Sequence, residues 1–378
     1  MKVNDYLSAI AAGMLGLLAM PAPVLAGPSI EFADGAGSVR LFGRVQADVL
    51  LDSGLPKAQQ DEFEWRSARL GANLRVGEDW HATLSVNLED SLELHEASIE
   101  YRGWPVWIEA GRIQESYGLS DLSSAQNLMM MERPQPALAL GADYGLGVAA
   151  YLRGERWGAS LGAFGKSGSD TLDGRDRALT ARVTGTPLRN DDWLLHLGAG
   201  LSQRDTPARI RFSARPETVL VSGLAVDGVR LAGVDDVQLA NLEFALRRGP
   251  VLVQAEYLRA SVSGAGSPDY DGWYVEAGWV LTGESREYRT RRGVFRGVKP
   301  RTPLGEGGFG AVELTARYSK TDLADAVPGG ETGRIAGVGV NWTPVDAVRV
   351  QFNLLDIEER GTRVDSDTVA QMRVQFSF

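Results

Sequence analysis

The chain ends in Val369-Ala370-Gln371-Met372-Arg373-Val374-Gln375-Phe376-Ser377-Phe378, in which every even position is apolar. Polar residues fill the odd positions after Val369. This alternation predicts a strand that is apolar on one face up to its last residue. In a globular domain that face would be exposed to water, whereas in a lipid-facing barrel it lies in hydrocarbon. The stretch therefore favours a transmembrane β-barrel that closes at its carboxy-terminus.

The amino-terminus is typical of an exported protein. Residues 1–26 combine Lys2, an apolar run over 7–20 and small residues up to Ala26, which predicts a signal peptide cleaved after Ala26. A short membrane anchor helix is the alternative, but it needs about 20 apolar residues, and two glycines interrupt this shorter run. The expected mature unit is one barrel domain over 27–378.

Composition narrows the class further. The 378 residues are 44% hydrophobic and include no cysteine. No later apolar run is long enough for a transmembrane helix, and an exported chain without cysteine has no disulfide framework and no thiolate metal site. A soluble periplasmic protein and a membrane β-barrel remain, because a barrel alternates lipid-facing and lumen-facing residues and is only averagely hydrophobic.

Period-2 alternation recurs along the chain, for example over 80–88 and 348–354. Tight connections such as Gly77-Glu78 alternate with longer polar ones such as 53–62. An even strand number and this asymmetry favour an all-β antiparallel barrel of about 16 strands over a soluble sandwich or a two-domain β-protein. The predicted strands lie near 40–52, 63–76, 79–90, 94–103, 105–113, 143–153, 156–165, 176–186, 192–203, 236–248, 251–262, 271–282, 309–320, 332–343, 347–358 and 368–378.

A barrel of this size holds a water-filled channel narrowed by inward-folded loops, so passive diffusion is the expected activity. The formal net charge of -10 does not fix the selectivity, because the acidic residues can lie on external loops.

The connection between the ninth and tenth predicted strands carries Arg209, Arg211 and Arg215 on one side of an extended chain. Residues two apart stand about 6.6 Å apart there, so the guanidinium groups form a row of similar anion sites. Arg44 and Arg69, on the polar faces of the first two strands, extend this anion pathway. Loop arginines that are simply solvated are the alternative.

The long connection over 114–142 is the candidate constriction loop. Ser123, Ser124 and Gln126 offer uncharged polar groups that can replace part of an ion's hydration shell. The apolar stretch 128–131 is expected to pack against the wall, and the methionines in it then serve only as anchors.

The segment 283–308 breaks the alternation and, by parity, lies on the periplasmic side. We expect it to fold back toward the pore and to draw anions through the exit. A charged turn that faces lipid headgroups or a periplasmic partner is the alternative. Its candidate residues are Arg289, Arg291, Arg292, Arg296 and Lys299.

Several motifs in order along the chain resemble the phosphate-selective porin O and P family. They include Gly111-Arg112, Tyr117-Gly118-Leu119, Ser123-Ser124, Glu132-Arg133, Ala255-Glu256-Tyr257-Leu258, Leu281-Thr282-Gly283-Glu284-Ser285-Arg286-Glu287-Tyr288, Val298-Lys299-Pro300, Ala316-Arg317-Tyr318 and Gly339-Val340-Asn341-Trp342. The resemblance implies a sixteen-stranded barrel, usually trimeric, in which an arginine ladder leads to a lysine-rich phosphate site.

Arg209, Arg211 and Arg215 are similar to that ladder. Where phosphate-binding members carry a lysine after the paired serines, this chain has Gln126. The departure favours a broader anion or small-solute pore.

The sequence thus predicts an outer-membrane porin of a Gram-negative bacterium that passes small anions, with phosphate as one candidate. A weakly selective small-solute porin and a structural or enzymatic barrel are the alternatives. His81, His95 and His196 stand in no nucleophile motif, so we expect no catalytic residue, cofactor or metal. Expected partners are small solutes, outer-membrane lipid, two further copies in a homotrimer and, since the last strand resembles an assembly signal, the barrel-assembly machinery; nucleic acid is not expected.

Overall fold

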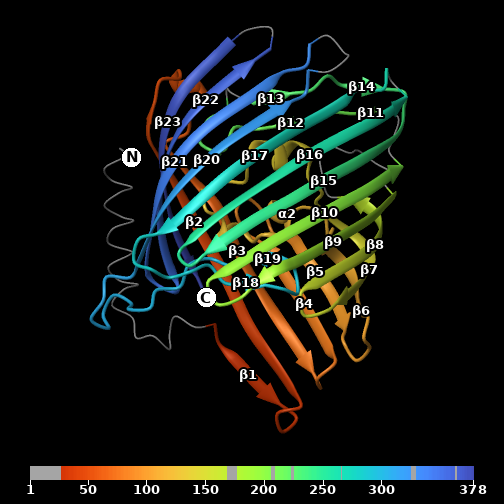
Figure 1. The fold of residues 1–378 in the computed structure, drawn as a ribbon, viewed down its shortest axis with the longest axis vertical. Helices are drawn as coiled ribbons and strands as arrows, with labels where there is room; N and C mark the ends of the chain where they lie inside the picture. Colours follow the sequence, from red (N-terminus) through yellow and green to blue (C-terminus); the bar gives the residue numbers. More distant parts are fainter. Residues whose placement is uncertain are drawn as a thin grey trace.

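Sixteen antiparallel strands form a closed barrel in the computed structural model (Figure 1), which describes residues 27–167, 177–205, 209–222, 225–264, 266–324, 329–361 and 364–378. The expected signal peptide, 1–26, lies outside the described residues. The barrel strands are β2 (Gly37–Ser53), β3 (Phe63–Val76), β4 (Trp80–Asn87), β5 (Glu93–Tyr101), β6 (Trp107–Gln114), β7 (Tyr144–Arg153), β8 (Trp157–Ser167), β9 (Arg177–Arg189), β10 (Trp193–Asp205), β15 (Val234–Arg248), β16 (Val251–Gly264), β17 (Asp269–Val280), β20 (Ala311–Asp322), β21 (Thr332–Val345), β22 (Val348–Arg360) and β23 (Val364–Ser377).

The barrel closes where the last strand meets the first. β23 pairs with β2 in a register that sets Ser377 opposite Arg44, and Phe378 exchanges backbone hydrogen bonds of 3.1 Å with Gly43. Each predicted strand coincides with one barrel strand, and the predicted bounds shift by only a few residues. An additional strand, β1 (Ser29–Phe32), pairs with the start of β2 and extends below the barrel (Figure 1).

The two faces of the wall differ as the alternation predicts. Outward-facing Leu84, Leu146 and Val338 are more than half exposed, whereas inward-facing Gln371 and Arg373 are fully buried. The apolar surface therefore covers the outside of the barrel, and the polar side chains fill the lumen.

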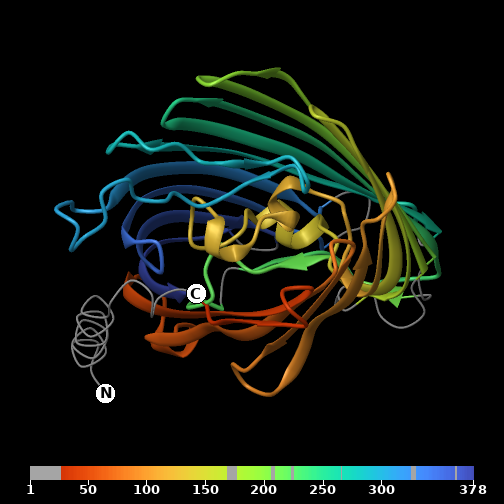
Figure 2. The ribbon, with the colours of Figure 1, turned by 90° about the horizontal axis from the view of Figure 1, so that it is seen from below.

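Among the described residues, three segments fold into the lumen, two of them from the end that carries the long loops. Figure 2 shows the helices of the first segment, in yellow, inside the ring of strands. The constriction loop, 115–143, contains α2 (Leu119–Leu122), η3 (Ala125–Asn127) and α3 (Gln135–Leu140). The arginine loop, 209–222 and 225–233, contains the short strands β11 (Arg209–Ile210), β12 (Ser213–Ala214), β13 (Val226–Asp227) and β14 (Leu231–Ala232).

The third segment, the turn hairpin over 281–310, comes from the opposite end, and its part with β18 (Tyr288–Arg289) and β19 (Val294–Phe295) folds inward. That end carries the short turns and Phe378, and it faces the periplasm in outer-membrane barrels. A further short helix, η2 (Lys57–Gln59), lies in an external loop. Within the described residues, no helix is long and apolar enough to cross a membrane.

Candidate functional site

The constriction loop is fixed to the barrel wall through Glu132. Arg66 donates to both carboxylate oxygens, at 2.6 Å from Nε and 2.9 Å from Nη2. Arg373, which also binds Asp48 on β2, donates at 2.6 Å, and Arg215 of the arginine loop donates at 3.0 Å. Burial alone would raise the pKa of Glu132, but Arg66 and Arg373 outweigh it and hold that pKa well below its usual range.

Other contacts seat the same loop. The backbone amides of Leu119 and Ser120 donate to the carboxylate of Glu256 on β16, at 2.7 and 2.8 Å. The side chain of Met130 is 1% exposed and packs with Ile335 of β21. This burial supports the reading of the methionines as anchors.

A cavity of about 440 Å³, here called the upper cavity, lies beside the constriction loop. Its lining includes six arginines and three acidic residues, so cations predominate. They are Arg44, Arg66, Arg69, Arg133, Arg204 and Arg292, with Glu96, Asp121 and Asp143.

Two predicted pathway residues, Arg44 and Arg69, lie directly opposite each other on β2 and β3 and line this cavity. Arg44 donates to Ser67 Oγ at 3.0 and 3.2 Å, and Arg69 Nε donates to Asn87 Oδ1 at 2.9 Å. Neither has a carboxylate within ion-pair distance in the part of the chain that the structure describes. Their charges therefore remain available to solutes.

Arg133 is a lining residue that strand parity could not identify. Its guanidinium donates to the backbone oxygens of Ser120, Asp121 and Ser123, at distances of 2.7 to 3.2 Å. These neutral acceptors leave its charge uncompensated. Glu132-Arg133 was visible as a motif, but the direction of each side chain depends on the fold of the loop.

The predicted constriction residues differ in their placement. Ser123 and Ser124 line the upper cavity, and Ser123 Oγ donates to the backbone oxygen of Leu119 at 2.7 Å. Gln126 is not among the residues that line it. Its backbone oxygen instead accepts a hydrogen bond of 3.3 Å from Arg349.

The arginine loop packs its apolar side, Ile210 and Phe212, into a buried cluster with the wall. Arg211 pairs with Asp227 at 2.6 Å, both half-exposed, and Arg209 is exposed. Arg209, Arg211 and Arg215 are absent from the linings of the three described cavities. Their role in a pathway stays a prediction.

The turn hairpin divides its predicted basic residues between two environments. Arg289, Arg291 and Arg292 line a lower cavity of about 550 Å³. Arg296 and Lys299 instead form partly exposed ion pairs, with Glu287 at 3.2 Å and with Asp346 at 3.1 Å, and line none of the three cavities.

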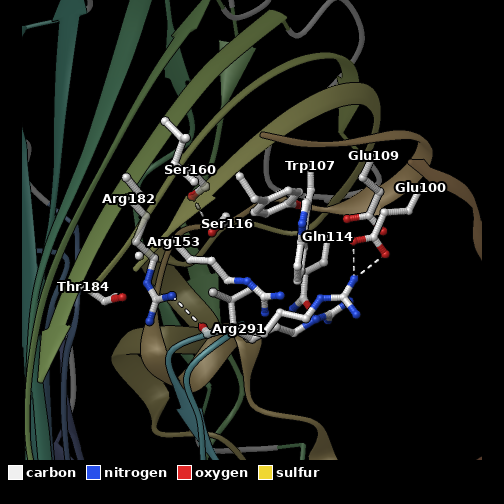
Figure 3. Close-up of a pocket in the computed structure, with 16 residues that line it drawn as sticks. Glu100, Trp107, Glu109, Gln114, Ser116, Arg153, Ser160, Arg182, Thr184 and Arg291 are labelled. Carbon is white, nitrogen blue, oxygen red and sulfur yellow. Dashed lines mark hydrogen bonds and ion pairs between the residues drawn. The ribbon is translucent and has the colours of Figure 1, made fainter. Parts of the chain in front are cut away.

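A small side cavity of about 50 Å³ lies next to the lower one (Figure 3). Arg291 pairs there with Glu100, and its guanidinium lies 4.8 Å from the ring centroid of Trp107. Arg153 stacks on the same ring at 3.4 Å. Arg292 lines all three cavities, so it stands where they meet.

Carboxylates on β5 and β6 face these arginines, and sequence reasoning missed them. Glu96 lines the upper cavity, Glu100 and Glu109 line the lower one, and Glu100 and Glu109 are Cα partners. The sequence did carry a signal for them, because Glu96, Ser98 and Glu100 alternate along one strand and therefore share its polar face.

Residues 39–378 match the family model described as phosphate-selective porin O and P. A Caulobacter vibrioides protein described as uncharacterized is 30% identical over 383 residues, covering 93% of this chain and 76% of that protein. Porin O of Pseudomonas aeruginosa is 25% identical over 377 residues, covering 86% of this chain and 84% of Porin O.

Two solved structures have a similar fold. The anion-selective porin from Comamonas acidovorans aligns with a TM-score of 0.62 and 15% identity, over 90% of this chain and 100% of that one. The outer membrane channel DcaP of Acinetobacter baumannii aligns with a TM-score of 0.59 and 13% identity, over 94% of this chain and 100% of that one. With this barrel and the family match over residues 39–378, the chain belongs to the phosphate-selective porin O and P family of outer-membrane porins.

Proposed function

We propose that this porin conducts small anions by passive diffusion, with phosphate among them, and that Arg44, Arg69 and Arg133 provide the attraction. The carrying observation is that these three guanidinium groups line the upper cavity without a carboxylate partner among the described residues. Successive cation sites of similar strength favour entry of an anion without deep trapping.

The charge balance of the upper cavity supports a modest anion preference. Glu132 compensates Arg66, and Glu115 compensates Arg204. Burial raises the pKa of Asp121 to about 7, so this lining carboxyl is partly neutral at physiological pH. Four lining arginines without a carboxylate partner among the described residues therefore face two carboxylates, Glu96 and Asp143, and the partly neutral Asp121.

The relatives support the same direction. One fold neighbour is named an anion-selective porin, and the family description names phosphate. The family and the fold indicate a channel rather than an enzyme. Arg209, Arg211 and Arg215 would extend the attraction into the external vestibule.

A weakly selective small-solute porin is the second candidate. Glu96 and Asp143 share the upper cavity with the arginines and reduce the local positive potential. We also propose export through the signal peptide 1–26, assembly through the terminal strand by the barrel-assembly machinery, a homotrimer, and a wall in contact with outer-membrane lipid.

Reversal potentials in planar bilayers under a KCl gradient test the anion proposal. We expect chloride preference in the wild type, and a smaller one in Arg44→Gln and Arg69→Gln. Arg259→Gln is the matched control, because Arg259 pairs with Asp269 at 2.6 Å and is exposed on a strand position outside the cavities. Cation preference in the wild type would contradict the proposal.

Phosphate is tested separately by its block of the KCl current relative to sulfate. Block by phosphate that weakens in Arg69→Gln supports a phosphate pathway. Equal responses to the two oxyanions would leave a general anion pore.

A further inference from the structure

Arg292 lies at the junction of the passage through the lumen. It lines the upper, lower and side cavities. Its backbone is held by Arg182 of β9, whose guanidinium donates to the carbonyl oxygens of Arg292 and Gly293 at 2.8 and 3.1 Å. A solute moving between the upper and lower cavities therefore meets this side chain.

The wall that faces Arg292 is acidic. Glu96 of β5 lines the upper cavity, and Glu109 of β6 lines the side and lower cavities. The two carboxylates come from adjacent strands, whereas Arg292 comes from the turn hairpin. Opposite charges from structurally independent elements thus line the same cavities.

Arg292, Glu96 and Glu109 form no close ion pair with one another among the described residues. None of Arg292, Glu96 and Glu109 takes part in an ion pair of 4 Å or less within the described ranges, although Arg291 and Glu100 beside them do. Arg292 is enclosed by protein, yet its side chain is exposed because lumen space surrounds it. A solute in the cavities can therefore approach each of these groups.

Arg292 keeps its charge in this setting. Burial lowers its pKa, but the attraction of Glu109 and Glu96 outweighs burial and raises it above the usual value. The junction of the cavities therefore holds a permanent cation together with carboxylates from other elements, which produces an electric field between them.

We propose that this opposed set selects dipolar solutes that carry both an ammonium and a carboxylate group, of amino-acid size. The carboxylate of such a solute faces Arg292 while its ammonium faces Glu96 or Glu109. A simple anion gains the first contact but meets repulsion from the second, whereas a dipole gains both. This inference rests on the proposed function only in requiring that solutes pass through the lumen. It does not require that the pore prefer anions.

Swelling of proteoliposomes that contain the purified porin provides the test. The probes are the amino acid alanine, a zwitterion at neutral pH, and its neutral isomer lactamide, so size is matched. Protein-free liposomes correct for passage through lipid. We expect alanine to enter about two- to fivefold faster than lactamide, the factor that corresponds to one half-exposed ion pair.

Arg292→Gln and Glu109→Gln should each bring the ratio of alanine to lactamide entry close to one. Arg292→Lys, which keeps the positive charge, should retain the wild-type ratio. Arg259→Gln, outside the lumen, should keep the wild-type ratio. Glu96→Gln is a second test of the acidic wall if Glu109→Gln does not assemble, as judged by heat-modifiable migration. A wild-type ratio of one, or a ratio unchanged in Arg292→Gln, would overturn the inference.

Reversal potentials on the same preparations separate this inference from the proposed function. Chloride preference with equal entry of alanine and lactamide leaves anion conduction and removes the dipole selection. Cation preference with faster entry of alanine removes the proposed anion conduction and leaves the dipole selection.

Discussion

Replacing Glu132 by glutamine should release the constriction loop from the barrel wall. Glu132 is 3% exposed and accepts hydrogen bonds from Arg66, Arg373 and Arg215. Glutamine keeps the shape, but it loses the charge and replaces one acceptor oxygen with an NH₂ group that faces arginine donors.

The magnitude follows from which partners remain. Removing one member of a buried ion pair costs about 3–5 kcal/mol, because the other charge stays without compensation. Arg373 retains Asp48, at 2.6 and 2.7 Å, so we take the lower end of that range. A loss of about 3 kcal/mol lowers the ratio of seated to released loop by about a hundredfold.

Two electrical readouts should change together. Single-channel recordings should show more current noise, because a loosely seated loop moves within the pore. The reversal potential should shift toward stronger anion preference, because Arg66 lines the upper cavity and loses its compensating carboxylate.

The matched control is Glu287→Gln. Glu287 is 62% exposed and pairs with Arg296 at 3.2 Å, and a surface pair of this kind contributes about 0–1 kcal/mol. If Glu132→Gln shows the same noise and reversal potential as Glu287→Gln, Glu132 is not the anchor of the loop.

Three further predictions concern other parts of the chain. Burial raises the pKa of Asp121 to about 7, so lowering the pH from about 8 to 6 should remove a negative charge from the upper cavity and increase anion preference; Asp121→Asn should abolish this dependence, and a variant that still follows pH would assign the titration elsewhere. Arg211→Gln should shift the reversal potential toward cations, whereas the double change with Asp227→Asn removes both charges of the 2.6 Å pair and should leave it unchanged; no shift in the single variant means that Arg211 is only solvated. Phe378→Ala should reduce the heat-modifiable barrel recovered from outer membranes, because the closing strand beside Gly43 then ends without its aromatic side chain. Full recovery would remove Phe378 from the assembly signal.

The barrel was predictable because each strand has two different surroundings. Lipid on one side and polar lumen on the other impose period 2, so Leu84 and Arg373 could be assigned to opposite faces from parity alone. β1 was missed, because it extends beyond the wall and lacks two contrasting environments.

The site was predictable only where it lies on strands. Arg44 and Arg69 line the upper cavity as parity predicts. Arg133 and Arg292 lie in irregular segments, where tertiary contacts and not sequence spacing set the direction of a side chain. Within the turn hairpin, the sequence predicts the same role for Arg292 and Arg296. In the structure Arg292 lines the lumen cavities, whereas Arg296 pairs with Glu287 outside them.

The inward segments from opposite ends of the barrel meet at Asn127 of the constriction loop. Its backbone oxygen accepts a hydrogen bond of 2.6 Å from Arg286, and its Oδ1 accepts one of 3.0 Å from the amide of Gly297. Arg286 is itself fixed by Glu313 of β20, at 2.7 and 2.8 Å. The constriction loop and the turn hairpin thus position each other.

Asn127→Ala should uncouple these two segments while the barrel wall stays intact. The change leaves the Gly297 amide without its acceptor, a loss of about 1–3 kcal/mol that acts on the hairpin carrying Arg292. We expect more current noise and a lower ratio of alanine to lactamide entry, with heat-modifiable migration unchanged. Asn127→Asp, which keeps an acceptor oxygen for that amide, should retain the ratio. Neither change alters Arg292 or the carboxylates of β5 and β6. An entry ratio that falls only in Asn127→Ala therefore means that selectivity depends on where the hairpin holds Arg292. Equal ratios in both variants mean that the hairpin is positioned without Asn127.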